Sequence, residues 1–230
     1  MARKRVAVLI SGRGSNMVAL AEAAGDPAYP AEIVGVISNK ADARGLNAAA
    51  ALGIEAKAIT RADFPGKAAH DDAIDAELTR LRADIVCLAG YMRLLTPAFT
   101  EKWAGRIINI HPSLLPLFPG LDTHGRALEA GMRVHGCTVH FVTAEMDGGP
   151  IIAQAAVPVL PGDDQDALAR RVLTVEHQLY PLALRLVAEG RARMEGGRTV
   201  LAGVGASGSL LSPGSASEAI DIESLARMTP

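Results

Sequence analysis

Short apolar runs alternate with longer segments of helical spacing along the first half of the chain, and this alternation constrains the fold more than any other feature. The apolar runs span residues 6–11, 33–38, 54–59, 84–89 and 106–110, and the helical segments span 16–24, 43–52, 66–81 and 97–103. A strand, a crossover helix and a second strand in succession are typical of a parallel sheet. Because the runs are nearly continuous in Val, Ile and Leu, we expect strands that helices cover on both faces.

A different pattern follows Gly120. A helix near 126–130 precedes two longer strands at 134–143 and 151–160, and the loop at 144–150 has the composition of a hairpin connection. A long helix at 163–189 then carries one apolar stripe, formed by Leu168, Val172, Val175, Leu179, Leu182 and Leu186. The sequence therefore predicts an α/β fold: an open, mostly parallel twisted sheet with helices on both faces, completed by a C-terminal antiparallel strand pair and a long helix.

Composition restricts the class of protein. Of the 230 residues, 49% are hydrophobic and 21% are charged, which is typical of a globular chain, and we expect one domain over 1–202. Residues 203–214 are rich in Gly and Ser and lack hydrophobic periodicity, so we expect a flexible tail over 203–230. The 23 basic and 25 acidic residues are balanced, without a long run of Lys or Arg, which argues against a nucleic-acid partner.

A secreted or membrane protein is also disfavoured. The apolar run at 6–10 is too short for the core of a signal peptide or for a membrane span. Cys87 and Cys137 both lie inside apolar stretches, which is typical of buried reduced thiols rather than a disulfide. We therefore expect a cytoplasmic protein without a membrane partner, present as a monomer or a homodimer.

The first candidate site is the segment SGRGSN at 11–16, between the first strand and the first helix. Backbone N–H groups at a helix N-terminus attract anions, and Gly14 lets the backbone approach them closely. The side chains of Ser15 and Asn16 add polar contacts, so the segment indicates a phosphate site. Met17 stands where a dinucleotide fingerprint needs a third glycine, and the P-loop lysine is absent. A tight turn that binds no ligand stays open as an alternative.

The second candidate lies at the end of the strand at 106–110. Asn109 and His111 are two residues apart, so in a strand their side chains share one face, at the edge where open α/β sheets bind ligands. An amide beside an imidazole suits acyl transfer, because the amide stabilises a developing oxyanion while the imidazole moves a proton. A purely structural histidine is the competing interpretation.

Asp147, in the loop MDGGP at 146–150, is the third candidate. A carboxylate in a Gly-rich loop can orient a histidine from another strand and stabilise its charged form, although Asp-Gly is also a common turn dipeptide. The remaining histidines show no metal-like spacing with Cys or carboxylates, so we predict no metal site.

Four segments, taken together, resemble a known family: SGRGSN at 11–16, LAGYMR at 88–93, NIHPSLLP at 109–116 and DGGP at 147–150. Their order and spacing resemble those of the phosphoribosylglycinamide formyltransferases, over about residues 5–195. The resemblance implies a Rossmann-like formyltransferase fold over the predicted domain. It also implies transfer of the formyl group of 10-formyltetrahydrofolate, a cosubstrate, to the amine of glycinamide ribonucleotide in de novo purine biosynthesis, through a tetrahedral intermediate and without a metal.

The resemblance assigns roles residue by residue. It places the catalytic groups on Asn109, His111 and Asp147. It places the substrate-binding residues on Gly14, Ser15, Asn16 and Glu176. It places the folate-binding residues on Lys67, Met92, Arg93, Leu94, Leu95, Asn109, Thr143, Ala144, Glu145, Met146 and Asp147.

Three positions depart from the family pattern. Lys67 stands where many members have Arg, Leu117 where Lys is common, and Asp122 where His is common. Lys67 keeps the positive charge but loses the planar guanidinium that binds carboxylates bidentately. The three departures concern details of the substrate and folate pockets.

Other functions remain open. Methionyl-tRNA formyltransferase and formyltetrahydrofolate hydrolase share Asn-x-His and a distant Asp. The first is expected to carry a further C-terminal domain with a basic surface, and the second an extra N-terminal domain, whereas this chain reaches its first strand at Val6. A non-catalytic nucleotide-binding module, in which the same polar residues are structural, is an alternative from a different class.

Overall fold

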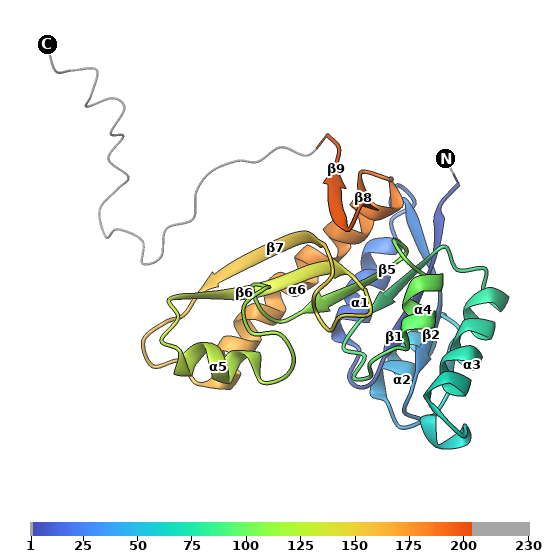
Figure 1. Ribbon diagram of the computed structural model, residues 1–230, viewed down its shortest axis with the longest axis horizontal. Helices are drawn as coiled ribbons and strands as arrows, with labels where there is room; N and C mark the ends of the chain where they lie inside the picture. Colours follow the sequence, from blue (N-terminus) through green and yellow to red (C-terminus); the bar gives the residue numbers. More distant parts are fainter. Residues whose placement is uncertain (1, 204–230) are drawn as a thin grey trace, which may run out of the picture.

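A seven-stranded sheet in the order β3-β2-β1-β4-β5-β6-β7 forms the centre of the computed structural model, which describes residues 2–203 (Figure 1). Its strands are β1 (Lys4–Ile10), β2 (Ala31–Ser38), β3 (Ala56–Ala58), β4 (Ile85–Leu88), β5 (Ile107–His111), β6 (Val134–Phe141) and β7 (Ile151–Pro158). The helices are α1 (Ser15–Ala24), α2 (Arg44–Ala51), the short 3-10 helix η1 (Arg61–Asp63), α3 (Lys67–Arg80), α4 (Pro97–Lys102), α5 (Thr123–Glu129) and α6 (Gln165–Ala188). Strands β1 to β5 pair in parallel, and β6 pairs antiparallel with both β5 and β7, which confirms the predicted fold class.

The order of the strands reverses at β1. From β1 the chain moves outward to β2 and β3, and it then returns to β4 on the other side of β1. In open α/β sheets, ligands bind outside the carboxyl ends of the strands at such a switch point. The chain leaves β1 into the segment 11–16 and leaves β4 into the segment 89–96, while β5 ends at His111. The topology therefore brings three segments remote in sequence to one edge of the sheet.

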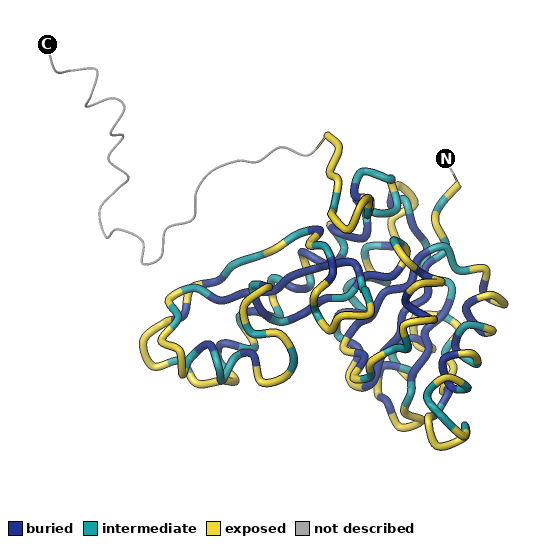
Figure 2. The backbone as a smooth tube through the Cα atoms, in the orientation of Figure 1, coloured by how far each residue is buried: buried dark blue, intermediate teal, exposed yellow. Residues whose placement is uncertain are grey.

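Both faces of the parallel strands are buried. Along β1, Val8 and Ile10 pack into a core that includes residues of α1 and α6, whereas Ala7 and Leu9 pack into a second core that includes residues of α3 and α4. Figure 2 shows the buried part of the backbone following the strands, with exposed residues on the loops and the outer turns of the helices. Each buried Val or Leu side chain stabilises the fold by about 1.5–3 kcal/mol, which explains the near-continuous apolar runs.

The buried face of α6 differs from the predicted stripe. Its buried members are Leu168, Val172, Leu179 and Leu186. Leu182, however, is 51% exposed, so its predicted burial is wrong. An α-helix turns by about 100° per residue, so the members Leu168, Val175 and Leu182, spaced by sevens, shift by about 20° around the helix at each step. By Leu182 this series has left the face on which Glu176, Ala183 and Leu186 are buried, whereas Val172, Leu179 and Leu186 stay on it.

A hairpin that the sequence pattern does not predict follows α6. It consists of β8 (Ala192–Glu195) and β9 (Arg198–Leu201), joined by Gly196 and Gly197. Both glycines have positive φ, 56° and 73°, as a two-residue hairpin turn requires. The strands are too short to show a clear alternation. Apart from Gly203, the predicted flexible tail lies outside the described residues. Within residues 2–203, no helix combines the length and apolarity needed to cross a membrane.

Candidate active site

The segment 11–16 forms a tight connection between β1 and α1. Gly14 precedes the helix at φ 77°, and a Cβ on it would lie 2.8 Å from the Cα of Gly45. Glycine is therefore required here both by the left-handed backbone and by the close approach of α2. Gly14 provides no side-chain cap, so N–H groups of the first turn of α1 have no capping acceptor. This arrangement suits an anion.

Asn16 and Glu176 meet across 160 positions of sequence. The Asn16 Nδ2 donates to Glu176 Oε2 at 2.6 Å, and both side chains are buried. Burial raises the pKa of Glu176, while the bond from Asn16 acts in the opposite direction. Asn16 Oδ1 is buried without a hydrogen-bond partner among the described residues. Because buried acceptors are normally satisfied, this oxygen is available to a donor such as a ligand hydroxyl or amine.

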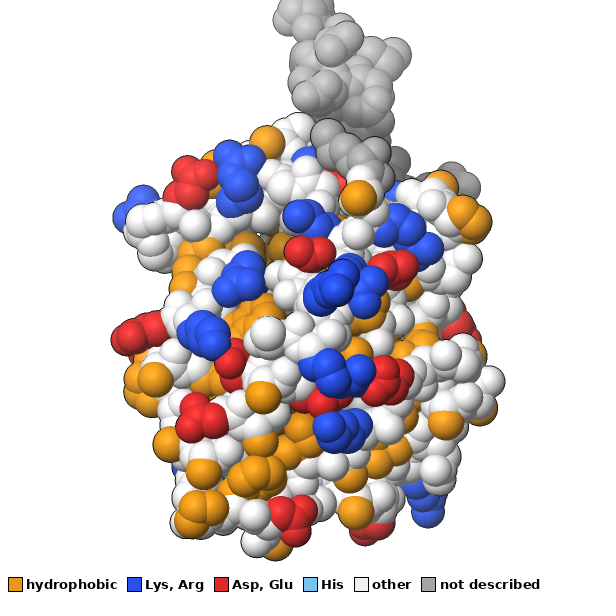
Figure 3. All heavy atoms as spheres, turned by 90° about the vertical axis from the view of Figure 1, so that its right-hand side faces the viewer, with side chains coloured by type: hydrophobic (Ala, Val, Ile, Leu, Met, Phe, Trp, Pro, Cys, Tyr) orange, Lys and Arg blue, Asp and Glu red, His pale blue; other side chains and the backbone are white. Residues whose placement is uncertain are grey.

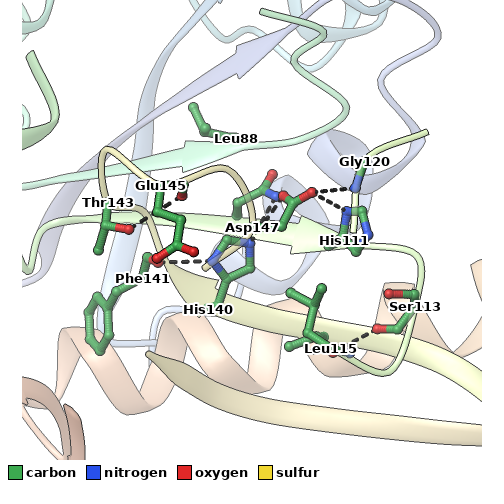
Figure 4. A network of polar contacts seen from close by, with 12 residues as sticks. Leu88, His111, Ser113, Leu115, Gly120, His140, Phe141, Thr143, Glu145 and Asp147 are labelled. Atoms are coloured by element: carbon green, nitrogen blue, oxygen red, sulfur yellow. Dashed lines mark hydrogen bonds and ion pairs between the residues drawn. The ribbon is translucent and has the colours of Figure 1, made fainter. Parts of the chain in front are cut away.

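His111 lies between two acceptors at the end of β5. Its Nε2 is 3.0 Å from the Phe118 carbonyl oxygen. Its Nδ1 is 3.5 Å from Asp147 Oδ2 (Figure 4). A carbonyl and a carboxylate only accept hydrogen bonds, so the imidazolium is the form that donates to both. Phe118 adopts φ 55°, which is uncommon for an aromatic residue, and this conformation belongs to the loop that carries its carbonyl to His111.

Asp147 converges on the same point from the loop after β6. Its Oδ2 accepts the Gly120 N–H at 2.8 Å, and its Oδ1 lies 3.9 Å from His140 Nε2. Asp147 itself has φ 53°, and its side chain is only 13% exposed. The carboxylate is thus held between two loops and faces two histidines. Its position does not resemble that of a turn aspartate pointing into solvent.

His140 is a residue of this site that sequence reasoning missed. Its Nδ1 lies 2.9 Å from the Phe141 carbonyl and therefore donates to it, so Nε2 accepts from Asn109 Nδ2 at 3.2 Å. Burial lowers the pKa of His140, which agrees with this neutral form. The bond fixes which end of the Asn109 amide faces His140 and leaves one N–H of that amide for a ligand. The register of β5 and β6, which places Asn109 opposite His140, is not readable from the sequence.

Apart from Lys67, which begins α3, and Asn109 on β5, the predicted folate-binding residues lie in the loops that follow β4 and β6. Met92 and Leu94 are 66% and 60% exposed, and Met146 is 53% exposed. Thr143 Oγ1 contacts the Glu145 carbonyl at 3.4 Å, which joins two positions of the loop 143–147. The Lys67 ammonium donates to the Leu95 carbonyl at 3.1 Å rather than projecting freely. Ala144 lies in the same loop and is exposed.

Leu117 and Asp122, the two other predicted departures, lie in the connection between β5 and α5. Leu117 is 49% exposed and accepts a bond from Ser113 Oγ at 2.6 Å through its carbonyl. Asp122 precedes α5 at φ 54°, and its Oδ1 accepts from Gln165 Nε2 at 2.8 Å. Asp122 therefore links the segment 117–122 to the start of α6. Within the described residues, no group of His, Cys, Asp and Glu side chains has the arrangement of a metal site.

Buried histidines around His111 make stability depend on pH. Burial lowers the pKa of His135 from 6.5 to about 4, with the charge of His124 acting in the same direction. Between these values the unfolded chain binds a proton that the folded chain does not, so stability is lost as pH falls below 6.5 toward 4. We expect a lower free energy of unfolding at pH 5 than at pH 7, by on the order of 1 kcal/mol for this residue. Urea unfolding measures it.

The control is His135→Asn, which keeps a polar side chain but does not titrate in this range. The difference between the two pH values should shrink in this variant. An unchanged difference contradicts the assignment to His135.

Comparison with known proteins gives a consistent family. The model of the formyl transferase family matches residues 4–184. The phosphoribosylglycinamide formyltransferase of Escherichia coli (strain K12) is 48% identical over 189 residues, which cover 82% of this chain and 89% of that protein. The trifunctional purine biosynthetic protein adenosine-3 of Drosophila pseudoobscura pseudoobscura is 52% identical over 193 residues, 83% of this chain, but the chain spans only 14% of that protein.

Solved structures agree. The crystal structure of phosphoribosylglycinamide formyltransferase from Brucella melitensis aligns with a TM-score of 0.79 at 61% identity, over 81% of this chain and 96% of that one. The crystal structure of glycinamide ribonucleotide transformylase 1 from Symbiobacterium toebii aligns with a TM-score of 0.84 at 49% identity, over 86% of this chain and 94% of that one.

Proposed function

The chain belongs to the formyl transferase family, and we propose that it transfers the formyl group of 10-formyltetrahydrofolate to the amine of glycinamide ribonucleotide. The products are formylglycinamide ribonucleotide and tetrahydrofolate, and the reaction belongs to de novo purine biosynthesis. The observation that carries the proposal is the convergence of Asn109, His111 and Asp147, with 3.5 Å between imidazole and carboxylate, at the sheet edge that also holds the start of α1. We further propose one formyltransferase domain over 1–202.

The proposed reaction forms one C–N bond and breaks another. The amine of the ribonucleotide attacks the formyl carbon, and the carbonyl oxygen becomes an oxyanion in a tetrahedral intermediate. The free N–H of Asn109 donates to that oxygen, and the positive charge of the His111 imidazolium stabilises it. The bond to the folate nitrogen then breaks, and the proton lost by the amine is delivered to that nitrogen. Asp147 stabilises the imidazolium and assists this proton transfer. The folate is a cosubstrate, and we propose a route without a metal or a covalent enzyme intermediate.

The ribonucleotide is proposed to bind at the start of α1. Its phosphate accepts from the N–H groups beside Gly14 and Ser15, where the helix dipole also favours an anion. Asn16, in the first turn of α1, and its partner Glu176 on α6 offer an unpartnered oxygen and a carboxylate to the rest of the ribonucleotide. Their pairing supports the proposal, because a buried carboxylate with one partner keeps acceptor capacity for hydroxyl groups.

Glu176→Gln tests the ribonucleotide side. We expect the KM for the ribonucleotide to rise by about tenfold, because a hydrogen bond to a charged acceptor is replaced by one to a neutral amide. The KM for the folate should stay within about twofold of wild type. Steady-state kinetics with each substrate varied in turn measures both. Glu101→Gln, an exposed glutamate on α4, is the matched control. Equal changes in the two KM values would contradict a role specific to the ribonucleotide.

The folate is proposed to bind between the loops 91–96 and 143–147. Exposed Met92, Leu94 and Met146 offer apolar surface to a ring system, and the backbone of both loops offers hydrogen-bonding groups. Lys67, which lies at the start of α3, is proposed to face the folate carboxylates, although it now contacts the Leu95 carbonyl. The weaker fit of an ammonium to a carboxylate makes this the least specific contact.

The partners are proposed to be small molecules. On the face that carries α3 and α4, Lys and Arg side chains are interspersed with Asp and Glu and form no continuous basic surface (Figure 3). Cys87 and Cys137 are free and buried, and burial raises the pKa of both thiols to about 12. Inert buried thiols fit a reducing compartment, so we propose the cytoplasm.

One assay separates the candidate functions. Purified protein is mixed with 10-formyltetrahydrofolate, and the absorbance change on loss of the formyl group is followed with and without glycinamide ribonucleotide. Turnover that requires the ribonucleotide is the expected result. Turnover without any acceptor indicates the hydrolase, and no turnover under either condition indicates a non-catalytic nucleotide-binding module.

A further inference from the structure

A buried polar cluster outside the proposed catalytic groups lies under the loop that follows β4. His70 and Asp71 are on α3, and Arg93 is in the loop at 91–96. His70 is 0% exposed, and the side chains of Asp71 and Arg93 are 3% and 16% exposed. Burying such groups is costly unless they are hydrogen-bonded, so their contacts are expected to have a function or a strong structural reason.

The partners of His70 determine its protonation. Its Nε2 lies 2.7 Å from the Ile59 carbonyl oxygen, and its Nδ1 lies 2.6 Å from Arg93 Nη1. A carbonyl only accepts and a guanidinium only donates, so Nε2 carries the proton and Nδ1 accepts from Arg93. The edge of the Phe64 ring against the imidazole holds its plane, with 5.5 Å between centroids. His70 is thus a neutral acceptor aimed at one guanidinium.

Asp71 and Ser11 hold the two ends of the same loop. Asp71 Oδ2 accepts the Thr96 N–H at 2.7 Å, and its Oδ1 lies 4.0 Å from Arg93 Nη2. Ser11 Oγ accepts the Met92 N–H at 2.8 Å. Between Met92 and Thr96, Arg93 is the one charged residue. Its side chain is directed inward, where His70 binds it. The loop therefore alternates, with Tyr91 and Arg93 directed inward and Met92 and Leu94 exposed.

We propose that His70 is a positioning residue for folate binding. By accepting from Arg93, it draws the guanidinium under the loop 91–96 and holds the outward side chains and the backbone of that loop in place for the folate. The Arg93 side chain then acts as an internal anchor, and contact with the folate falls to the loop backbone and to Met92 and Leu94. This inference rests on the proposed function, which assigns the loop to the folate.

Two variants of His70 each reproduce the position of one of its ring nitrogens and so separate its two contacts. The Oδ1 of asparagine lies as many bonds from Cα as Nδ1 of histidine, and the Nε2 of glutamine as many as Nε2 of histidine. His70→Asn therefore keeps an acceptor for Arg93 and loses the bond to Ile59, whereas His70→Gln keeps that bond and loses the acceptor. Each variant loses one buried hydrogen bond, so we expect similar drops in melting temperature. Only His70→Gln releases Arg93.

We expect His70→Gln to weaken folate binding without changing turnover. In His70→Gln, the KM for the formyl folate and the Kd for tetrahydrofolate, measured by calorimetry, rise by about tenfold, because a charge-assisted hydrogen bond is lost. The kcat and the KM for the ribonucleotide stay within about twofold of wild type. His70→Asn retains folate affinity near the wild-type value.

Arg93→Met provides an independent route if a His70 variant does not fold. It keeps the apolar stem, removes the guanidinium and should raise the folate Kd as His70→Gln does. The double variant His70→Gln/Arg93→Met should bind folate as Arg93→Met alone, because His70 acts through Arg93.

Equal folate affinity in His70→Asn and His70→Gln overturns the inference, as does an additive loss in the double variant. So does an Arg93→Met variant with wild-type folate affinity. A wild-type protein that binds no tetrahydrofolate and transfers no formyl group overturns the proposed function itself. The calorimetry on wild type therefore separates the two failures.

Discussion

Replacing His111 with alanine is expected to lower kcat by about a hundredfold or more, with both KM values nearly unchanged. In the structure the imidazole is held between the Phe118 carbonyl at 3.0 Å and the Asp147 carboxylate at 3.5 Å. An imidazole held in this way does not have to reorient when the oxyanion forms. It therefore stabilises the transition state more than it stabilises the bound substrates. A loss in kcat without a matching change in KM is the signature of such an interaction.

Asn109→Ala should give a loss of similar size. One N–H of its amide is bound to His140 at 3.2 Å, and the other is the proposed donor to the same oxyanion. Removing one such donor costs about 10²–10³ in kcat. Because both groups act on one oxygen, the double variant should lose less than the product of the single losses.

Steady-state kinetics, with circular dichroism and thermal melting to verify folding, checks both variants. Asn47→Ala, which removes an exposed amide from α2, is the matched control and should keep wild-type kinetics. If folded Asn109→Ala and His111→Ala enzymes both turn over at near-normal rates, the assignment of the catalytic groups is wrong.

Asp147→Asn is expected to lower kcat by about a hundredfold while the fold is retained. Asparagine preserves an acceptor for the Gly120 N–H, which Asp147 now binds at 2.8 Å, and removes only the negative charge facing His111 and His140. The imidazolium then loses its counter-charge, so it is held less well beside the oxyanion.

Thermal melting separates an electrostatic role from a structural one. A distorted loop lowers the melting temperature together with kcat, whereas a lost counter-charge lowers kcat while the melting temperature stays near the wild-type value. Asp42→Asn, which removes an exposed carboxylate, is the control. A near-normal kcat in folded Asp147→Asn contradicts the proposed role.

Most of the fold was predictable because its elements are encoded locally. The apolar runs at 6–11 and 84–89 contain most of β1 (Lys4–Ile10) and all of β4 (Ile85–Leu88), since strands buried on both faces need uninterrupted apolar residues. The run at 54–59 is longer than β3 (Ala56–Ala58), an edge strand that pairs only with β2. The β8–β9 hairpin was not predictable, because its short strands carry too few apolar positions for a period to emerge.

The candidate site, too, was only partly predictable from the sequence. Sequence alone determined the alternating elements, and hence the sheet edge to which Gly14, Asn109 and His111 belong, because these depend on periodicity and on neighbouring residues. The pairing of Asn109 with His140, of Asn16 with Glu176 and of Arg93 with His70 was decided only by tertiary structure. Each of these contacts joins residues from different elements, so it depends on strand register, helix rotation and loop conformation, which long-range packing determines jointly.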